Sequence, residues 1–348
     1  MSNQNPVNQN DVARLAGVSR SVVSYVLNNG PRKVSEETRQ RVLNAINELG
    51  YRPNEHAQRL KQGSDAVENS IGIVTGGLGY NLLERPYYNI VLSGLYEYAY
   101  EQHQQISFIA YWEALQDPIF FNKHIHEQEI SSLIFILPSL IPQTKDNQKL
   151  LKKIISRIPY IVSLEENMLD LPTVMFDRAE AARTVMKHLI GLGHERIAFI
   201  AINDQRLVGY KQTLLEHNLP YDERLVNFMD QSPVQSSYDI IDGLIRSNTG
   251  FSAIFTATDE AAIGAMAALK DHGLEVPRDV AIASIDNIEI ASMLRPALTT
   301  IDIPKRTLAR LAIQSLQTQR DYDEQSQVSM LVPTKLIIRE SCGSHQAG

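Results

Sequence analysis

The sequence predicts a multidomain fold, in which an all-α head of three helices precedes an α/β core of two parallel-sheet lobes. Between residues 8 and 50, apolar residues recur at the three- and four-residue spacing of amphipathic helices. After residue 70, short apolar runs alternate with helical stretches, which is typical of parallel sheets covered on both faces. With 348 residues, 43% of them hydrophobic, the chain can form two or more domains with a large core.

The first two predicted helices meet at a tight corner. Asn8 is placed to cap the first helix, with Asp11 as an anion near its positive end. Gly17 can adopt the left-handed backbone that ends this helix, and Ser19 can cap the second by accepting a backbone N–H. Two short helices joined in this way form a helix-turn-helix.

The second helix separates an apolar face from a polar one. Val23, Val26 and Leu27 follow the spacing of a buried stripe. The residues left on the outer face are Arg20, Ser21, Ser24 and Tyr25. A helix of this kind fits the major groove of DNA, where side chains of its first turns reach base edges. Arg20 and Tyr25 are therefore predicted to read bases; the alternative is an ordinary solvated helix pair.

A third helix and a short segment complete the head. Ser35 opens the third helix, which Gly50 ends, and its apolar stripe contains Val42, Leu43, Ile46 and Leu49. Pro53 then breaks the run, and Asn54 is a fresh N-cap for at most two helical turns. A helix that short is marginal in water, so we expect it to form only when another structure holds it.

Several motifs, in their order and spacing, resemble those of the LacI/GalR family of bacterial transcription regulators. In the head they are Asp11-Val-Ala-x-x-Ala-Gly17-Val-Ser19, Val34-Ser-x-x-Thr38-Arg39 and Gly50-Tyr51-Arg-Pro53-Asn54. In the core they are Gly193-His194-x-Arg-Ile197, Arg206-x-x-Gly209-Tyr210, Asp259-x-x-Ala262-x-Gly264, Val276-Pro-x-Asp-Val280 and Leu298-Thr-Thr300. The resemblance spans nearly the whole chain and implies a periplasmic-binding-protein-like core.

The resemblance also implies which residues contact DNA. Arg20, Ser21 and Tyr25 would occupy operator-reading positions, whereas Ser24, Asn28 and Thr38 would contact phosphates. The full predicted set is Ser19, Arg20, Ser21, Ser24, Tyr25, Asn28, Thr38, Asn54, Ala57 and Leu60. Tyr25 departs from the Arg or His of many relatives, so their base preference cannot be copied.

Leu60 matches the hinge leucine that relatives insert into the minor groove at the centre of a palindrome. The residues agree with this role, because an apolar side chain in a polar two-turn segment lacks a core of its own, and apolar wedges are a known means of kinking DNA. The alternative is a linker leucine that lies against the next domain.

Charge is unevenly distributed along the chain. Residues 1–63 contain nine Lys and Arg against five Asp and Glu, a net charge of +4. Since the whole chain has 33 and 40 of these, the remainder has 24 and 35, a net charge of −11. A basic head attracts phosphate, whereas an acidic body does not compete for DNA.

The apolar runs of the core form two series of predicted strands. The first comprises residues 71–75, 106–110, 132–137 and 160–164, and the second 173–176, 197–201, 253–256 and 280–285. Length alone would allow one large lobe; the resemblance favours two, with crossovers near Pro172, Asp302 and Leu331 and last strands that complete both. The predicted domains are a head (1–52), a hinge and linker (53–69), an N-terminal lobe (70–172 plus 303–330) and a C-terminal lobe (173–302 plus 331–348).

The cleft between the lobes is the expected ligand site, because ligands of open α/β sheets bind outside the carboxyl ends of the strands. The candidate effector-binding residues are Tyr88, Phe176, Arg206, Thr258, Asp259 and Asp286. A guanidinium and a carboxylate suit hydroxyls or an anionic group, and an aromatic ring can stack on a sugar face. By resemblance, Arg206 and Asp286 match effector-contacting residues of the family, and Tyr88 its aromatic contact.

Each of these residues has a structural alternative. Asp259 or Asp286 could merely cap the helix that follows it, without binding a ligand. Arg206 could form a surface ion pair, and Tyr88 could belong to the lobe core. Thr258 departs from the Asn common in relatives, which leaves the identity of a sugar effector open.

Other kinds of chemistry have little support in the sequence. Its single cysteine, Cys342, excludes an internal disulfide, and no metal site, cofactor motif or Gly-x-Ser-x-Gly nucleophile motif is predicted. No apolar run reaches membrane-spanning length and the N-terminus lacks the pattern of a signal peptide, so we expect a cytoplasmic protein. Since no catalytic motif is found, we expect that it is not an enzyme.

Two functional hypotheses follow. The favoured one is a ligand-responsive, sequence-specific DNA-binding regulator, a repressor of sugar-uptake or catabolic genes that binds a palindromic operator as a homodimer. A small molecule, a sugar or sugar derivative, would control its release or recruitment. The alternative is a sugar-binding or sugar-processing protein whose N-terminal helices mediate protein contacts; the basic head and Leu60 argue against it.

Overall fold

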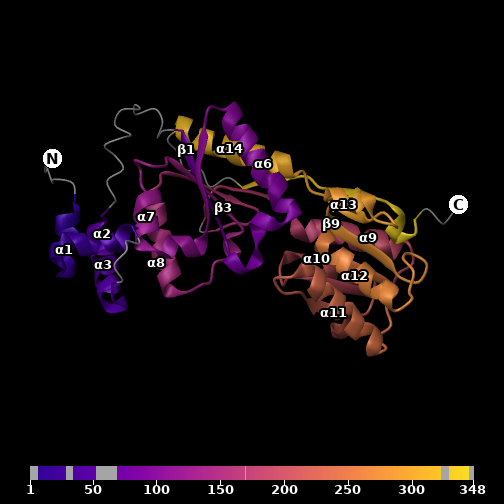
Figure 1. Cartoon of the computed structure of the whole chain (residues 1–348). Coiled ribbons are helices and arrows are strands. Elements are labelled where there is room, and N and C mark those ends of the chain that lie inside the picture. The colour runs from indigo at the N-terminus through magenta and orange to yellow at the C-terminus, as the bar shows by residue number, and fades with distance from the viewer. Residues whose placement is uncertain (1–6, 29–33, 52–68, 169, 323–328, 345–348) are drawn as a thin grey trace. The chain divides into compact units, whose positions relative to one another are not determined.

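A computed structural model of the chain describes residues 7–28, 34–51, 69–168, 170–322 and 329–344 (Figure 1). Two compact units account for it. The first comprises Met1–Leu78, Leu95–Val174 and Arg310–Ser329, and the second Gly79–Gly94, Met175–Ala309 and Met330–Gly348. Three of the divisions fall close to the crossovers expected from the sequence, whereas residues 79–94 group with the second unit.

The head consists of α1 (Gln9–Ala16), α2 (Arg20–Asn28) and α3 (Glu36–Leu49). Its predicted caps are confirmed. The backbone N–H of Asn8 donates to Asp11 Oδ2 at 3.0 Å, while the Asn8 side chain accepts from Asn10 N at 2.8 Å. Gly17 (φ 64°) and Gly50 (φ 61°) end α1 and α3 in the left-handed conformation that favours glycine.

The three helices of the head bury a small apolar core. Val12, Val23, Val42 and Ile46 have no exposed surface. The sequence pattern also places Val12 and Leu15 together on one apolar face of α1, and for Leu15 this is wrong. Leu15 is 45% exposed, while its small neighbours Ala13 and Ala16 are buried. The alanines lie on the same side of α1 as Val12, and a larger side chain is not needed to fill the space between closely packed helices.

The first sheet has the order β11-β5-β4-β3-β1-β2. Its strands are β1 (Ser70–Thr75), β2 (Gln105–Tyr111), β3 (Ser132–Ile136), β4 (Tyr160–Leu164), β5 (Thr173–Phe176) and β11 (Ser329–Val332). β5 corrects the sequence interpretation, which placed residues 173–176 in the second series. It pairs in parallel with β4, with Thr173 opposite Ser163. A buried apolar run predicts a strand but carries no information on its partner.

The second sheet has the order β12-β10-β9-β8-β6-β7. Its strands are β6 (Ile197–Ala201), β7 (Val226–Phe228), β8 (Ala253–Thr256), β9 (Ala281–Asp286), β10 (Thr299–Asp302) and β12 (Lys335–Ile337), and β12 pairs antiparallel with β10. β11 and β12 therefore complete one sheet each, as expected for the last strands.

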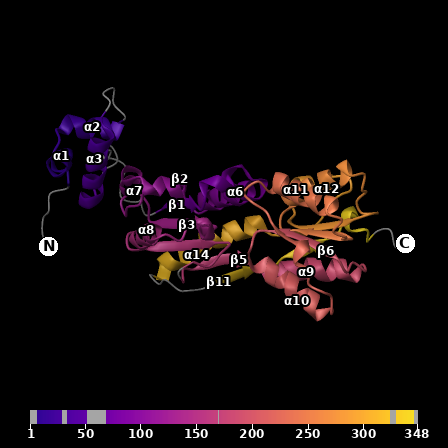
Figure 2. The same cartoon turned by 90° about the horizontal axis from the view of Figure 1, so that it is seen from below.

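Helices cover both faces of the second sheet. α9 (Arg178–Gly191) and α10 (Gln205–Glu216) lie on one face, and α11 (Pro233–Arg246) and α12 (Asp259–Asp271) lie on the other (Figure 2). The remaining helices are α6 (Pro86–Glu101), α7 (Pro118–His124), α8 (Lys145–Ile155), α13 (Glu289–Met293) and α14 (Lys305–Tyr322). Within this sheet β6, β8, β9 and β10 pair in parallel, so their carboxyl ends lie at one edge.

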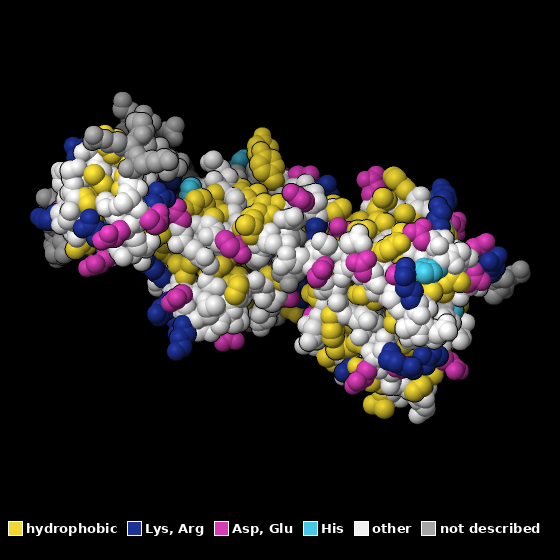
Figure 3. Space-filling view, turned by 60° about the horizontal axis from the view of Figure 1, so that its bottom comes forward, with side chains coloured by type: hydrophobic (Ala, Val, Ile, Leu, Met, Phe, Trp, Pro, Cys, Tyr) yellow, Lys and Arg dark blue, Asp and Glu magenta, His cyan; other side chains and the backbone are white. Residues whose placement is uncertain are grey.

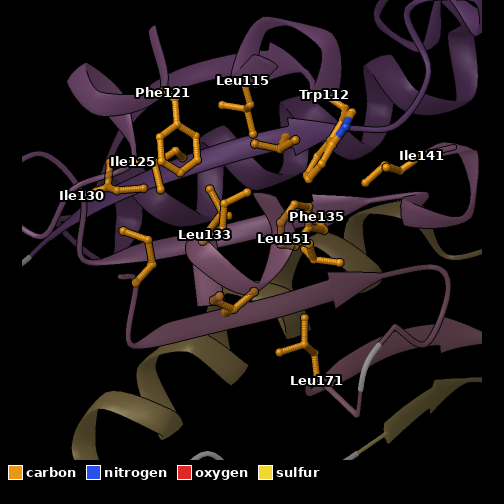
Figure 4. Close-up of a cluster of buried hydrophobic side chains, with 14 residues drawn as sticks. Trp112, Leu115, Phe121, Ile125, Ile130, Leu133, Phe135, Ile141, Leu151 and Leu171 are labelled. Carbon is orange, nitrogen blue, oxygen red and sulfur yellow. The ribbon is translucent and has the colours of Figure 1, made fainter. Parts of the chain in front are cut away.

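An apolar cluster of the first unit includes Trp112, Leu133 and Phe135, all fully buried (Figure 4). Its one indole N–H is satisfied, because Trp112 Nε1 donates to Asn147 Oδ1 at 3.0 Å. The largest apolar group of this core is thus buried without an unpaired donor. Among the described helices, none combines the length and the apolar composition that crossing a membrane requires.

We expect Leu189→Ala to destabilise the second unit by about 2–5 kcal/mol, because Leu189 of α9 is fully buried and its removal leaves a cavity. Leu215→Ala is the matched control, since Leu215 of α10 is 79% exposed and its loss should change stability by only about 0.5 kcal/mol. Urea unfolding measures both. Equal effects of the two substitutions would contradict the packing described.

Candidate functional site

The outer face of α2 presents short polar groups at the surface of the head. Ser19, Arg20 and Ser21 are exposed, and Ser24 and Tyr25 are half-buried. Ser19 Oγ accepts from Val22 N at 3.4 Å, which confirms its role as a cap, and lies 2.9 Å from Ser21 Oγ. Arg20 Nε donates to Gln9 Oε1 of α1 at 3.2 Å. The first helix therefore holds Arg20 at the beginning of the second.

The other predicted DNA contacts are described only in part. Thr38 lies in the first turn of α3, where its Oγ1 accepts from Ser35 Oγ at 2.9 Å. Asn28 is the last residue of α2. Asn54, Ala57 and Leu60 lie outside the described residues, so their roles stay predictions. Figure 3 shows Lys and Arg side chains at the surface of the head, on the face in view.

The carboxyl edge of the second sheet contains a buried ion pair. Arg206, in the first turn of α10, donates from Nη2 to Asp204 Oδ2 at 2.6 Å and from Nε to Oδ1 at 3.1 Å. Its Nη1 donates to the carbonyl of Ala257, just beyond the end of β8, at 3.1 Å. Arg206 is 6% exposed, so the alternative of a surface ion pair is wrong.

A second guanidinium approaches the same carboxylate. Arg178, the first residue of α9, is 8% exposed, and its Nε lies 3.7 Å from Asp204 Oδ2. Its guanidinium also stands 5.4 Å over the ring centre of Phe176. Burial opposes ionisation of Asp204, but Arg206 and Arg178 together hold the pKa of this carboxyl below its ordinary value.

Sequence reasoning missed both Asp204 and Arg178. The signals were present, since Asp204 follows a predicted strand and caps α10 by accepting from Arg206 N at 2.9 Å. Arg178 follows the strand that ends at Phe176. What the sequence does not give is the contact between them, because they are separated by the whole of α9 and β6.

The predicted aromatic contacts are buried. Phe176 is 2% exposed, and the guanidinium of Arg178 lies over its ring. Tyr88 is 9% exposed and packs edge-to-face on Tyr87, with ring centres 4.9 Å apart. Stacking of either ring on a ligand stays a prediction.

Asp259 has the contacts of a structural residue. It is fully buried and accepts hydrogen bonds from Ser284 Oγ, from Thr300 Oγ1 at 2.6 Å and from Ile288 N at 2.8 Å. Burial raises the pKa of this carboxyl. The cap of α12 is Thr258, whose Oγ1 accepts from Ala261 N at 3.2 Å. The carboxylate of Asp259 is thus engaged within the fold, and an effector contact by Asp259 or Thr258 stays a prediction.

Asp286 ends β9 in an unusual backbone conformation. Its φ is 127° and that of Asn287 is 51°, values that L residues seldom adopt. The Asn287 side chain holds the turn in place, because Nδ2 donates to Asp302 Oδ1 at 2.9 Å and Oδ1 accepts from Arg339 Nη2 at 2.7 Å. The buried ammonium of Lys305 donates to the Asp286 carbonyl. Strained residues held in this way are typical of ligand sites.

Two surfaces are thus in place. One is a helix-turn-helix with a polar outer face, and the other is a sheet edge with Asp286 at the end of β9 and Arg206 in the first turn of α10. The described part of the chain contains no group of three or more His, Cys, Asp or Glu side chains that could hold a metal ion. Together the fold and these surfaces define a class of protein, the DNA-binding regulator with a ligand-binding core.

Comparisons with known proteins agree. Residues 9–54 match the model of the bacterial regulatory proteins of the lacI family, and residues 186–342 that of a periplasmic binding protein-like domain. The HTH-type transcriptional regulator GalR of Salmonella typhimurium is 30% identical over 319 residues, which cover 87% of this chain and 86% of GalR. The chain therefore belongs to the LacI family, and it is a ligand-responsive DNA-binding transcriptional regulator rather than an enzyme.

Two solved structures share the fold. The transcriptional regulator CelR in complex with cellobiose has a TM-score of 0.70 at 25% identity, covering 96% of this chain and 99% of CelR. The lac repressor dimer bound to operator and the anti-inducer ONPF has a TM-score of 0.67 at 24% identity, covering 97% of this chain and 99% of that one.

We expect Asp204→Asn to lower the free energy of unfolding by about 3–5 kcal/mol at pH 7, because it leaves a buried guanidinium without its carboxylate. The pKa of Asp204 is lowered in the fold, so its stabilisation is complete above the ordinary value of 3.8 and is lost as pH falls through the lower folded pKa. The difference from wild type should hold from pH 7 to about 5 and shrink only below about 4.

Urea unfolding at several pH values measures this difference. Asp239→Asn is the control, since Asp239 is exposed on α11 and its loss should change stability by about 0.5 kcal/mol or less. A difference for Asp204→Asn that has already vanished at pH 5 would show that the ion pair does not stabilise the fold.

Proposed function

We propose that the chain is a repressor that binds a palindromic operator as a homodimer, and that a sugar or sugar derivative bound at the carboxyl edge of the second sheet controls this binding. The observation that carries the proposal is the outer face of α2, where Arg20 is exposed at the N-terminus of the second helix of a helix-turn-helix. Side chains in this position reach base edges in the major groove.

Binding to DNA combines two contributions. Arg20, Ser21 and Tyr25 would read bases, while Ser24, Asn28 and Thr38 would position the helix on phosphates. The net charge of +4 in residues 1–63 adds an attraction that weakens with salt. Since the proposed partner is chromosomal DNA, we propose that the protein acts in the cytoplasm.

Dimerisation follows from the symmetry of the target. A palindrome presents two half-sites related by a two-fold axis, and two heads are needed to read them. The solved lac repressor is a dimer on its operator, which supports the same arrangement here. The paired hinge segments around Leu60 would then meet at the centre of the site, where each leucine enters the minor groove.

Control by a ligand requires two states of the core that differ in their affinity for it. Ligand binding would shift the population towards one of these states. If the paired hinge segments order on DNA in that state, the ligand recruits the protein; if they do not, the ligand releases it. A coupling of about 1–3 kcal/mol changes DNA affinity about 5- to 150-fold, which is enough for regulation. CelR in complex with cellobiose supports a sugar as the ligand. Arg206 and Asp286 would hold its hydroxyl or anionic groups.

We expect Arg20→Ala to weaken binding to a DNA site obtained by in vitro selection by about 5- to 150-fold, because a bidentate contact to a base is worth about 1–3 kcal/mol. Arg14→Ala is the matched control, since Arg14 is an exposed residue of α1 that pairs with Asp11. Fluorescence anisotropy at fixed salt measures both. Equal losses for the two variants would mean that α2 does not read the site, and wild-type protein without salt-dependent DNA binding would favour a sugar-binding protein.

We expect Leu60→Ala to reduce both DNA bending and affinity for the selected site, because the apolar wedge is lost. Energy transfer between dyes at the two ends of the DNA measures the bend. Leu15→Ala serves as control, since Leu15 is an exposed leucine of α1. An unchanged bend in the Leu60→Ala complex would rule out the wedge.

A further inference from the structure

One helix of the first unit is basic, although the body of the chain is acidic. Residues 144–157, which contain α8 and its flanks, have five Lys and Arg against one Asp, a net charge of +4. This equals the net charge of residues 1–63, whereas residues 64–348 together have a net charge of −11. A surface that only confers solubility mixes charges of both signs, so a concentration of positive charge here indicates an anionic partner.

Three of these side chains form a stripe along the outer face of α8. Lys145, Lys149 and Lys152 follow one another at four- and three-residue spacing, which places them on one face of the helix, and all three are exposed. The other face of α8 packs into the apolar cluster of the first unit through Leu151 and Ile154. We call Lys145, Lys149 and Lys152 the lysine stripe.

The lysine stripe has little use inside the fold. Within the described part of the chain, Lys145 and Lys152 form no hydrogen bond or ion pair. Lys149 meets only Asp146, at 3.5 Å, and these two side chains are 79% and 92% exposed, so the pair contributes little to stability. The negative end of the helix dipole accounts for a cation at Lys152, but Lys145 is the first residue of α8, where a cation is unfavourable.

The stripe runs towards the edge of the first sheet at which the chain from the head enters the lobe. β1 begins at Ser70, directly after the residues that join the head to the lobe. β1, β3 and β4 are parallel and begin side by side, with Ile71 opposite Ser132 and Ser132 opposite Tyr160. Because α8 connects β3 to β4, its C-terminal end lies at this same edge.

A side chain of α14 holds these strand starts together. Arg320 Nη1 donates to Asn69 Oδ1 at 3.2 Å, and its Nη2 donates to Ser132 Oγ at 2.9 Å. Its guanidinium also lies 5.9 Å from the ring centre of Tyr160, the first residue of β4. The point at which the chain enters from the head is thus fixed beside the strand that follows α8. DNA held by the head is therefore tethered to this edge of the lobe.

We propose that the lysine stripe is a second DNA-contacting surface, which binds phosphates of the DNA that flanks the operator. Lysine ammonium groups bind phosphates as point charges and carry no base preference, so they add affinity rather than specificity. The inference rests on the proposed function, in which the head binds the operator. It assigns one helix of the core a part in DNA binding that the acidic body as a whole would oppose.

The test compares a short duplex that ends at the selected site with the same site flanked by about 15 base pairs on each side, about 50 Å of DNA. In the full-length stripe variant, all three residues of the lysine stripe are changed to Gln. The full-length control carries Lys187→Gln, Lys270→Gln and Lys335→Gln, at three exposed lysines of the second unit. Both lose three positive charges, but only the stripe variant alters α8. Fluorescence anisotropy at several salt concentrations measures binding.

We expect wild type and the control to bind the flanked duplex more tightly than the short one. The stripe variant should bind the short duplex as the control does, which also shows that it is folded. It should bind the flanked duplex at least about 10-fold more weakly than the control at about 0.1 M salt. Each phosphate contact that is lost should also reduce the slope of log affinity against log salt by about 1.

Equal affinities of the stripe variant and the control for the flanked duplex would overturn the inference and favour an acidic protein as the partner of this face. A wild type that gains no affinity from the flanks would overturn it too. In both cases binding of the short duplex shows that the proposed function stands. If wild type binds neither duplex, the proposed function fails and this inference fails with it.

Discussion

The ion pair of Asp204 with Arg206 is the interaction that holds together the carboxyl edge of the second sheet, where we propose that the ligand binds. The carboxylate of Asp204 caps α10, pairs with Arg206 through both oxygens, and through Arg206 reaches the carbonyl of Ala257 beyond the end of β8. Parallel strands end with backbone groups that need partners away from the ladder. One buried ion pair here supplies a partner for such a group, and it fixes α10 to the end of the neighbouring strand.

A second buried network connects the ends of the next strands of the sheet, β9 and β10. Asp259 binds groups from β9, from β10 and from the turn after β9, and Lys305 binds the carbonyl of Asp286. Burying such charged groups is costly, and apolar side chains would often stabilise a core as well. Both networks lie at the same edge of the sheet as the strained backbone of Asp286.

Local features of this chain could be read from its sequence, and non-local ones could not. Near neighbours in the chain predict the caps of α1 and α3 and the buried strands such as β3 and β8. They also predict the place of Asp286 at the end of β9 and of Arg206 after the loop that follows β6. The edge strand β7 has no buried residue, so no apolar run predicts it. The pairing of β5 with β4 could not be predicted, because several strands of the chain are similar apolar runs and any of them could be the partner of β5.

The contact between Arg178 and Asp204 is missed for the same reason. Each residue taken alone looks like an ordinary residue at a helix start, and only the packed helices α9 and α10 bring them together. The exposed Leu15 shows the reverse case, in which a residue with the right spacing is not needed by the core. Periodicity predicts the buried face of a helix more reliably than it predicts each member of that face.

The most direct test of the account is a double-mutant cycle between Asp204 and Arg206. The free energies of unfolding of wild type, Asp204→Asn, Arg206→Gln and the double variant give the coupling between the two side chains. The account predicts a coupling of about 1.5–3 kcal/mol, the range of buried hydrogen bonds between charged groups. Effects of the two substitutions that add to within about 0.5 kcal/mol would contradict the account, because this pair would then not stabilise the carboxyl edge of the second sheet.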